Sequence, residues 1–265
     1  LAHYQDFGHS LIYLYKTGQL AGRLDEADVL APLLLMMVRS LVYASREDLI
    51  PEFKAYGPAL ADWATATGRA VPVPQELAQG SVKRVLAMLL DGAGAEPLAL
   101  YDAAVGAAAW QMARYDMAYQ DHTTGPVSHN VGWLSFTHAL TFANAVRKSC
   151  ERMPALWPAG LLQIGCFLGR NAGFVDHDFD PAPFAVTDPA AFLADEKRKL
   201  FDHGNPEFIV SAHLVKLVTA VAEELAERPA APWAAEAAQA VNRFLTSPLK
   251  RKHALRAANQ ALAMI

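Results

Sequence analysis

Apolar side chains recur along most of the chain at intervals of three and four residues, the spacing of an amphipathic α-helix. The first example runs from about Tyr4 to Leu20, where Phe7, Leu11 and Leu14 are apolar. Strand-like runs rich in Val, Ile and Thr are nearly absent. Alanine, the residue with the highest helix propensity, is the commonest residue. The pattern therefore predicts an all-α protein.

The same periodicity predicts further helices, separated by polar or proline-rich stretches. They run from about Glu26 to Ala44, Pro51 to Thr67, Glu76 to Leu90, Pro97 to Gln120, Trp133 to Met153, Pro158 to Gly173, Pro206 to Glu227, Trp233 to Leu245 and Ser247 to Met264. We expect residues 1–265 to form one domain of about nine to ten helices around a buried cavity. The sequence begins at Leu1, in what looks like the middle of a helix. We therefore also keep open the interpretation that it is a fragment of a longer chain.

The predicted helix from Glu26 to Ala44 differs from the others because it is apolar almost all round. Apolar residues go almost all round it: Leu33, Met36, Met37, Leu41 and Val42. A helix without a polar face is typical of a protein interior, so we expect this helix to be central and buried.

Composition and charge exclude several classes of protein. Of the 265 residues 53% are hydrophobic and the net charge is −4, which excludes a disordered chain. No basic stripe is present, and the short stretch from Lys250 to Arg256 is expected to be a solvated helix face, so we predict no nucleic-acid partner. No apolar run reaches the length of a membrane span and no signal peptide is seen, so we expect a cytoplasmic protein.

Cysteine usage and missing motifs narrow the chemistry. Two cysteines cannot build a disulfide framework, a zinc finger or a four-cysteine iron–sulfur cluster, and Cys150 and Cys166 are expected to be buried thiols. No Glu-x-x-His, His-Glu-x-x-His or Gly-x-Ser-x-Gly motif occurs, which argues against di-iron carboxylate proteins, zincins and α/β-hydrolases. No dinucleotide or flavin motif is seen.

Three histidines lie within apolar stretches of three different predicted helices: His9, His138 and His213. A buried imidazole is costly unless it is hydrogen-bonded or bound to a metal. Helical bundles build their sites from facing helices, so these side chains could converge on one site, where neutral imidazoles would suit Zn, Fe or Cu. The alternative is that each is a satisfied core histidine.

Further polar residues near His138 are candidates for substrate contacts. Thr137, Thr141 and Asn144 form a stripe without Lys or Glu, which is typical of a cavity lining, although a polar seam between helices would look the same. Asp116 precedes a polar loop that could form the mouth of a pocket.

Three short segments resemble the questin oxidase-like family. They are Gly8-His9-Ser-Leu-Ile-Tyr13-Leu, Phe136-Thr-His138-Ala-Leu-Thr and Ala212-His213-Leu-Val-Lys216. The resemblance implies an α-helical monooxygenase that inserts oxygen into a cyclic or aromatic ketone or quinone in a Baeyer–Villiger-type reaction. NADPH would supply electrons, and some bacterial relatives are joined to a Rieske domain, so a Rieske-type or other electron-transfer partner is implied. The chain departs from the family at Tyr13, where a second histidine is expected.

The resemblance falls on the same three histidines, and it completes a hypothesis about the site. His9, His138 and His213 would act as metal ligands or as acid–base groups, and Lys216 would neutralise a developing oxyanion. Aromatic walls around a small-molecule substrate would come from Tyr13, Trp133 and Phe136. The alternative is a non-catalytic helical ligand-binding or scaffold module, in which the three imidazoles do not converge.

Overall fold

The computed structural model describes residues 3–24, 26–126, 129–204, 207–247 and 254–264. Within these ranges the secondary structure is helical, with only isolated β-bridges, and the all-α prediction is confirmed. The helices are α1 (His9–Ala21), α2 (Ala27–Val42), α3 (Tyr56–Trp63), α4 (Pro74–Ala78), α5 (Val82–Leu90), α6 (Pro97–Ala113), α7 (Ala118–Asp121), α8 (Trp133–Arg152), α9 (Trp157–Asn171), α10 (Pro189–Lys199), α11 (Phe208–Glu227), α12 (Ala234–Thr246) and α13 (Ala254–Leu262).

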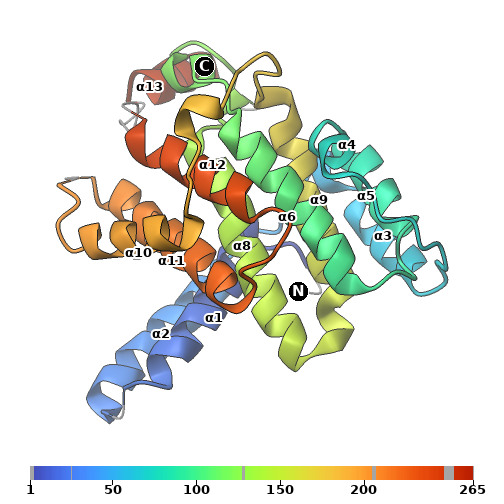
Figure 1. Ribbon diagram of the computed structural model, residues 1–265, viewed down its shortest axis with the longest axis horizontal. Helices are drawn as coiled ribbons and strands as arrows, with labels where there is room; N and C mark the ends of the chain where they lie inside the picture. Colours follow the sequence, from blue (N-terminus) through green and yellow to red (C-terminus); the bar gives the residue numbers. More distant parts are fainter. Residues whose placement is uncertain (1–2, 25, 127–128, 205–206, 248–253, 265) are drawn as a thin grey trace.

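Helices α6, α8 and α9 form the centre of the molecule (Figure 1). Helix α6 is buried along most of its length, and its alanines, such as Ala104 and Ala108, let neighbouring helices approach closely. Helices α4 and α12 pack against α6, while α5 packs against α9. The buried residues of these elements belong to one continuous apolar core.

Three helices far apart in the sequence meet on one side of this centre. Helix α8 packs against both α1 and α11, and Figure 1 shows these three helices running close together. Each carries one of the apolar-helix histidines, so their packing brings together residues more than a hundred positions apart.

The expectation of a central, buried α2 is wrong. None of its residues is buried, and α1 is the element against which it packs. Helices α1 and α2 form a hairpin that projects from the body, which we call the arm (Figure 1). The inner side of α2, including Leu33 and Met37, is partly covered by α1, whereas the rest of its apolar surface stays exposed. A helix that is apolar all round can therefore also lie at a surface that the described part of the chain leaves exposed.

Several predicted boundaries also change. The stretch from Pro97 to Gln120 breaks after Ala113, and the sequence pattern did not predict the charge-rich helix α10. The predicted start at Pro206 and most of the basic stretch that begins at Lys250 lie outside the described residues.

Two predictions from composition can be compared directly with the described residues. Cys150 and Cys166 are free and buried, as expected. Among the described residues, no helix is both long and apolar enough to cross a membrane.

Candidate metal centre

His9, His138 and His213 converge on one point. The Nε2 atom of His138 lies 2.8 Å from Nε2 of His9 and 3.2 Å from Nε2 of His213. One ring nitrogen of each histidine lies within 4.8 Å of the others. Two metal–nitrogen bonds of about 2.1 Å at tetrahedral or octahedral angles place their nitrogens roughly 3.0–3.4 Å apart. The His138–His213 distance falls in this range and the His9–His138 distance is slightly shorter, so the three residues could hold a metal ion.

The opposite edges of two of the imidazoles are fixed by a backbone carbonyl on their own segment. His9 Nδ1 lies 2.7 Å from the Asp6 carbonyl and His213 Nδ1 lies 2.6 Å from the Ile209 carbonyl. A carbonyl oxygen only accepts hydrogen bonds, so in neutral His9 and His213 the proton sits on the outer nitrogen. For His138, the Leu134 carbonyl is the weakest of the influences on the pKa of the ring.

The inner nitrogens of His9 and His213 therefore carry lone pairs that face Nε2 of His138. Neutral His138 can donate through Nε2 to one of these two neighbours, whereas a shared cation would satisfy all three nitrogens. Metal-bound histidines commonly donate their other N–H to a backbone carbonyl, which orients the ring. His9 and His213 have this arrangement.

Electrostatics disfavour a proton as that shared cation. Burial, followed by the charge of Lys216, lowers the pKa of His213 to about 4 and lowers the pKa of His9. The pKa of His138 falls well below its usual value for the same two reasons, with the neighbouring histidines adding to the effect. Neutral imidazoles at physiological pH are the form that binds transition metals.

A strained turn places His9 at the first position of α1. Asp6, Phe7 and Gly8 all have positive φ, at 51°, 46° and 81°. The turn is held by the Asp6 N–H, which donates to the Ser45 carbonyl, and by the Phe7 N–H, which donates to Glu47. Residues other than glycine rarely adopt this conformation, and such strain is often found at functional sites.

Gly8 is required at the end of this turn for a second reason. A Cβ atom there would lie 2.5 Å from the Phe142 ring on α8. The close approach of the turn to α8 lets His9 reach His138. The sequence signal for this turn is the glycine directly before His9. Its role as a residue with positive φ was not predicted.

Lys216 and Tyr13 are the other predicted site residues near the cluster. Lys216 lies one turn after His213 and its charge acts on all three imidazoles. Burial lowers the pKa of Lys216 to about 7. The Tyr13 ring stacks on the His9 ring, with 5.8 Å between their centres. Both residues therefore border the candidate metal position.

The two threonines of the polar stripe bond within α8, and its asparagine bonds to α11. The Thr137 hydroxyl donates to the Leu134 carbonyl and the Thr141 hydroxyl to the Thr137 carbonyl. The Asn144 amide donates to Glu224 on α11, while its carbonyl oxygen is buried without a partner in the described part of the chain. Their role as substrate contacts stays a prediction.

The remaining predicted substrate residues contact other elements. Asp116 accepts a hydrogen bond from the Ala118 N–H. Trp133 is buried, packs against Tyr115 and Phe244, and donates its indole N–H to Ser247. Phe136 packs against Tyr115. The described contacts of Trp133 and Phe136 thus lie in the packing around α8 and α12, and that of Asp116 lies at the start of α7.

Sequence reasoning missed a buried ionic network on the same three helices. Arg147 on α8 donates through Nε to both carboxylate oxygens of Glu224, at 3.0 Å and 2.8 Å, and also pairs with Glu227. On α1, Tyr15, Lys16 and Gln19 donate to Glu223 of α11. The network ties α1 and α8 to α11, and the charged residues that interrupt the apolar pattern of α8 and α11 were its sequence signal.

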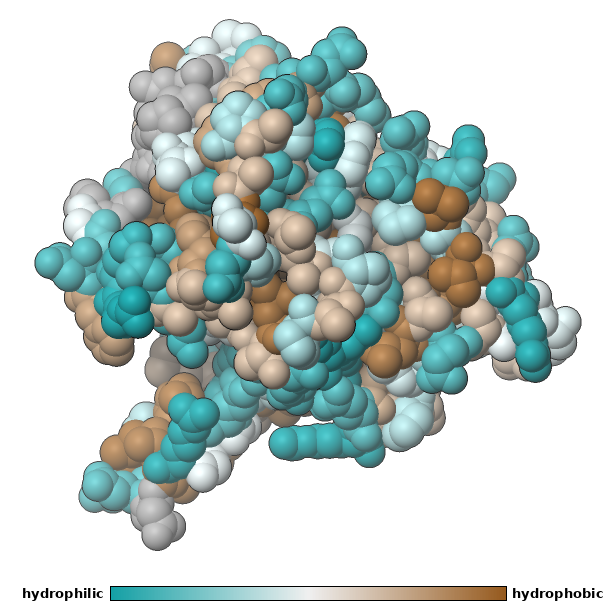
Figure 2. Space-filling view, viewed as in Figure 1, coloured by the Kyte–Doolittle hydropathy of each residue, from teal (hydrophilic) through white to brown (hydrophobic). Residues whose placement is uncertain are grey.

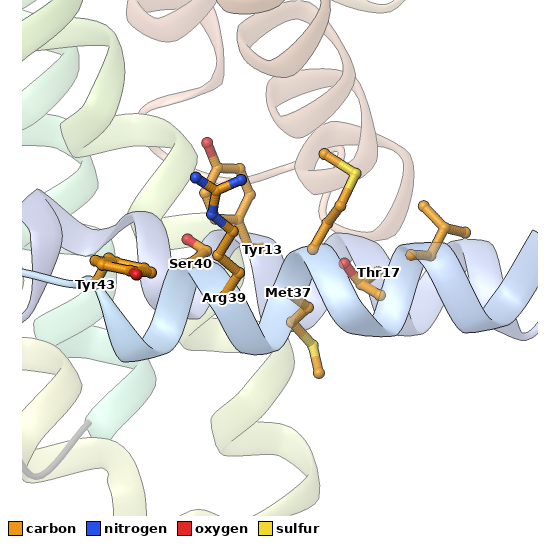
Figure 3. A pocket seen from close by; sticks show the side chains of 8 residues that line it. Tyr13, Thr17, Met37, Arg39, Ser40 and Tyr43 are labelled. Carbon is orange, nitrogen blue, oxygen red and sulfur yellow. The ribbon is translucent and has the colours of Figure 1, made fainter.

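A groove lies beside the His cluster, between the two helices of the arm. It has a volume of about 480 Å³ and is lined by Tyr13 and Thr17 from α1 and by Leu33, Met36, Met37, Arg39, Ser40 and Tyr43 from α2 (Figure 3). Since Tyr13 also stacks on His9, the groove opens next to the candidate metal position.

Comparisons of the chain with protein families, with curated proteins and with solved structures give no significant match.

Proposed function

We propose that the chain is a metal-dependent oxidoreductase, resembling questin oxidases, that oxidises or inserts oxygen into a cyclic or aromatic ketone or quinone. The observation that carries the proposal is the convergence of three buried or half-buried imidazoles, two of which have their outer nitrogens bonded to carbonyls. His9, His138 and His213 would hold iron, copper or zinc, and a metal with three protein ligands keeps open positions for substrate or oxygen.

A redox metal at this position would supply activation of oxygen or of the ketone. Lys216 would bind and neutralise a developing oxyanion, since an anion nearby favours its protonated form. Tyr13 would orient a planar substrate beside His9. The groove of the arm offers such a substrate an apolar path to the site.

The electron balance of the proposed reaction needs an external reductant. One atom of O₂ enters the carbon–carbon bond next to the carbonyl, and the other leaves as water. Two electrons come from NADPH, directly or through a Rieske-type or other electron-transfer partner. In keeping with the absence of a dinucleotide motif, a separate partner is the simpler route.

The test is turnover of aromatic ketones and quinones under ¹⁸O₂ by protein loaded with Fe(II) or Cu(II), with NADPH and a ferredoxin–reductase pair, beside Zn(II)-loaded protein as the redox-inactive comparison. We expect a product that carries one ¹⁸O atom and that disappears in His138→Ala. His122→Ala, at an exposed histidine, is the matched control. Metal-loaded protein that binds these compounds without turning them over would contradict the proposal and favour a non-catalytic ligand-binding module.

The non-catalytic module, as stated above, requires three imidazoles that lie apart, each bonded separately between helices. The three imidazoles converge instead. The non-catalytic alternative is therefore a protein that binds a metal for structural reasons only.

A further inference from the structure

The outer face of α2 is the most exposed apolar surface of the arm. Its four most exposed apolar side chains are Leu35 at 70%, Met36 at 70%, Val42 at 73% and, at the helix end, Tyr43 at 80%. With 3.6 residues per turn these four fall on one side of α2, and Met36 and Tyr43 also border the groove that Leu33 and Met37 line. Figure 2 shows hydrophobic residues on the projecting arm.

Two charges of opposite sign lie along the middle of this face. Helices α1 and α2 together carry only Lys16, Asp28 and Arg39 as charged side chains. Lys16 is paired with Glu223. Asp28 and Arg39 are exposed, and neither forms an ion pair with a described residue. They are eleven residues apart, so about three helical turns place both on the same side of the helix.

We infer that a second copy of this chain covers the face, through antiparallel packing of the two α2 helices about a two-fold axis. In a two-fold interface residue i of one protomer meets residue j of the other, and j meets i. With the axis midway between the two charges, Asp28 of each protomer faces Arg39 of its partner. Pro32, Leu35 and Met36 then lie near the axis, with Val42 and Tyr43 at the ends.

The exposed apolar area of this face approaches what a stable dimer needs. At roughly 200 Å² for a large apolar side chain, the four side chains above present on the order of 600 Å². A standard interface needs about 800 Å² per partner.

The composition of the face also favours a second copy over a membrane surface. Membrane-binding helices carry Lys and Arg along their polar side, and α2 has one Arg balanced by one Asp. Protein interfaces are enriched in Met, aromatic residues and Arg and depleted in Lys and Glu, as this face is. Asp28 and Arg39 can each pair with the other residue on a second α2, so the face is complementary to a copy of itself.

The test is the molar mass of the full chain by light scattering and sedimentation between 1 and 50 µM. We expect twice the 28.7 kDa of one chain. Leu35→Glu is expected to give a monomer with unchanged helix content and unchanged metal content, whereas Phe201→Glu, at a 95% exposed residue outside the arm, stays dimeric.

A charge exchange tests the antiparallel register itself. Arg39→Asp places two carboxylates opposite each other and is expected to weaken dimerisation by about tenfold or more. Asp28→Arg combined with Arg39→Asp restores the opposite charges and is expected to restore the dimer. A wild-type monomer at 50 µM, a dimer that survives Leu35→Glu, or a double variant no tighter than Arg39→Asp would overturn the inference. So would a monomer that floats with vesicles of phosphatidylcholine and phosphatidylglycerol.

Discussion

The Nε2 atom of His138 lies 2.8 Å from the Nε2 atom of His9, whose proton the Asp6 carbonyl holds on the opposite nitrogen. His213 approaches His138 from α11, and its outer nitrogen is bonded to the Ile209 carbonyl. Backbone carbonyls thus orient two of the three rings toward His138. This orientation, more than proximity alone, supports a metal centre.

The turn before α1 gives a prediction about Gly8. Gly8→Ala places a side chain at positive φ and against Phe142, so it is expected to lower the free energy of unfolding by about 2 kcal/mol or more. It is also expected to weaken metal binding, because His9 would shift away from His138. Chemical denaturation and a metal titration measure the two effects.

Gly18→Ala is the matched control for that variant. Gly18 lies within α1, and a Cβ atom there meets nothing within 4 Å. It is expected to stabilise the protein by about 0.5–1 kcal/mol with metal binding unchanged. Equal effects of the two alanines would show that the strained turn has no special role.

The buried ionic network predicts a large stability loss without a change in the metal site. Arg147→Met leaves the Glu224 carboxylate buried and unpaired, which is expected to cost about 3–5 kcal/mol. The double variant Arg147→Met/Glu224→Met is expected to recover most of that loss. Thermal and urea unfolding measure both, and Arg198→Met, at an exposed ion pair, is expected to change neither. A double variant as unstable as the single one would contradict this account.

Lys216 gives the pH prediction. Burial lowers its pKa in the folded protein to about 7, against roughly 10.5 when unfolded. Between these values the unfolded chain binds one more proton, so the stability of metal-free protein rises with pH. From pH 7.5 to 9.5 the gain attributed to Lys216 is about 2 kcal/mol. Urea unfolding in chelator is expected to show this gain in wild type and not in Lys216→Met; equal slopes in both proteins would argue against a buried, neutral Lys216.

Part of this structure could be predicted from the sequence because it depends on local pattern. The helical period and the alanine content identify the fold class, and polar rings within apolar helices identify His9, His138 and His213. Their convergence could be proposed because a buried imidazole needs a partner, but distances required the tertiary packing of α1, α8 and α11.

Other features depend on relationships that periodicity does not contain. The apolar pattern of α2 is the same for a buried helix and for an exposed apolar helix. The sequence therefore predicted a buried α2, which is wrong. The positive φ values at Asp6 and Phe7 arise from contacts with Ser45 and Glu47, some forty residues away. The pairing of Arg147 with Glu224 likewise joins residues 77 positions apart.

The most direct test of the metal centre is the metal content of the purified protein by mass spectrometry, beside that of His138→Ala and the control His122→Ala. We expect about one equivalent of iron, copper or zinc in wild type and in His122→Ala, and its loss in His138→Ala with the same helical circular dichroism. A metal-free wild type expressed with all three metals supplied, or a His138→Ala variant that keeps its metal, would contradict the central claim. A His138→Ala chain that merely unfolds would show that His138 supports the fold and would count against the site.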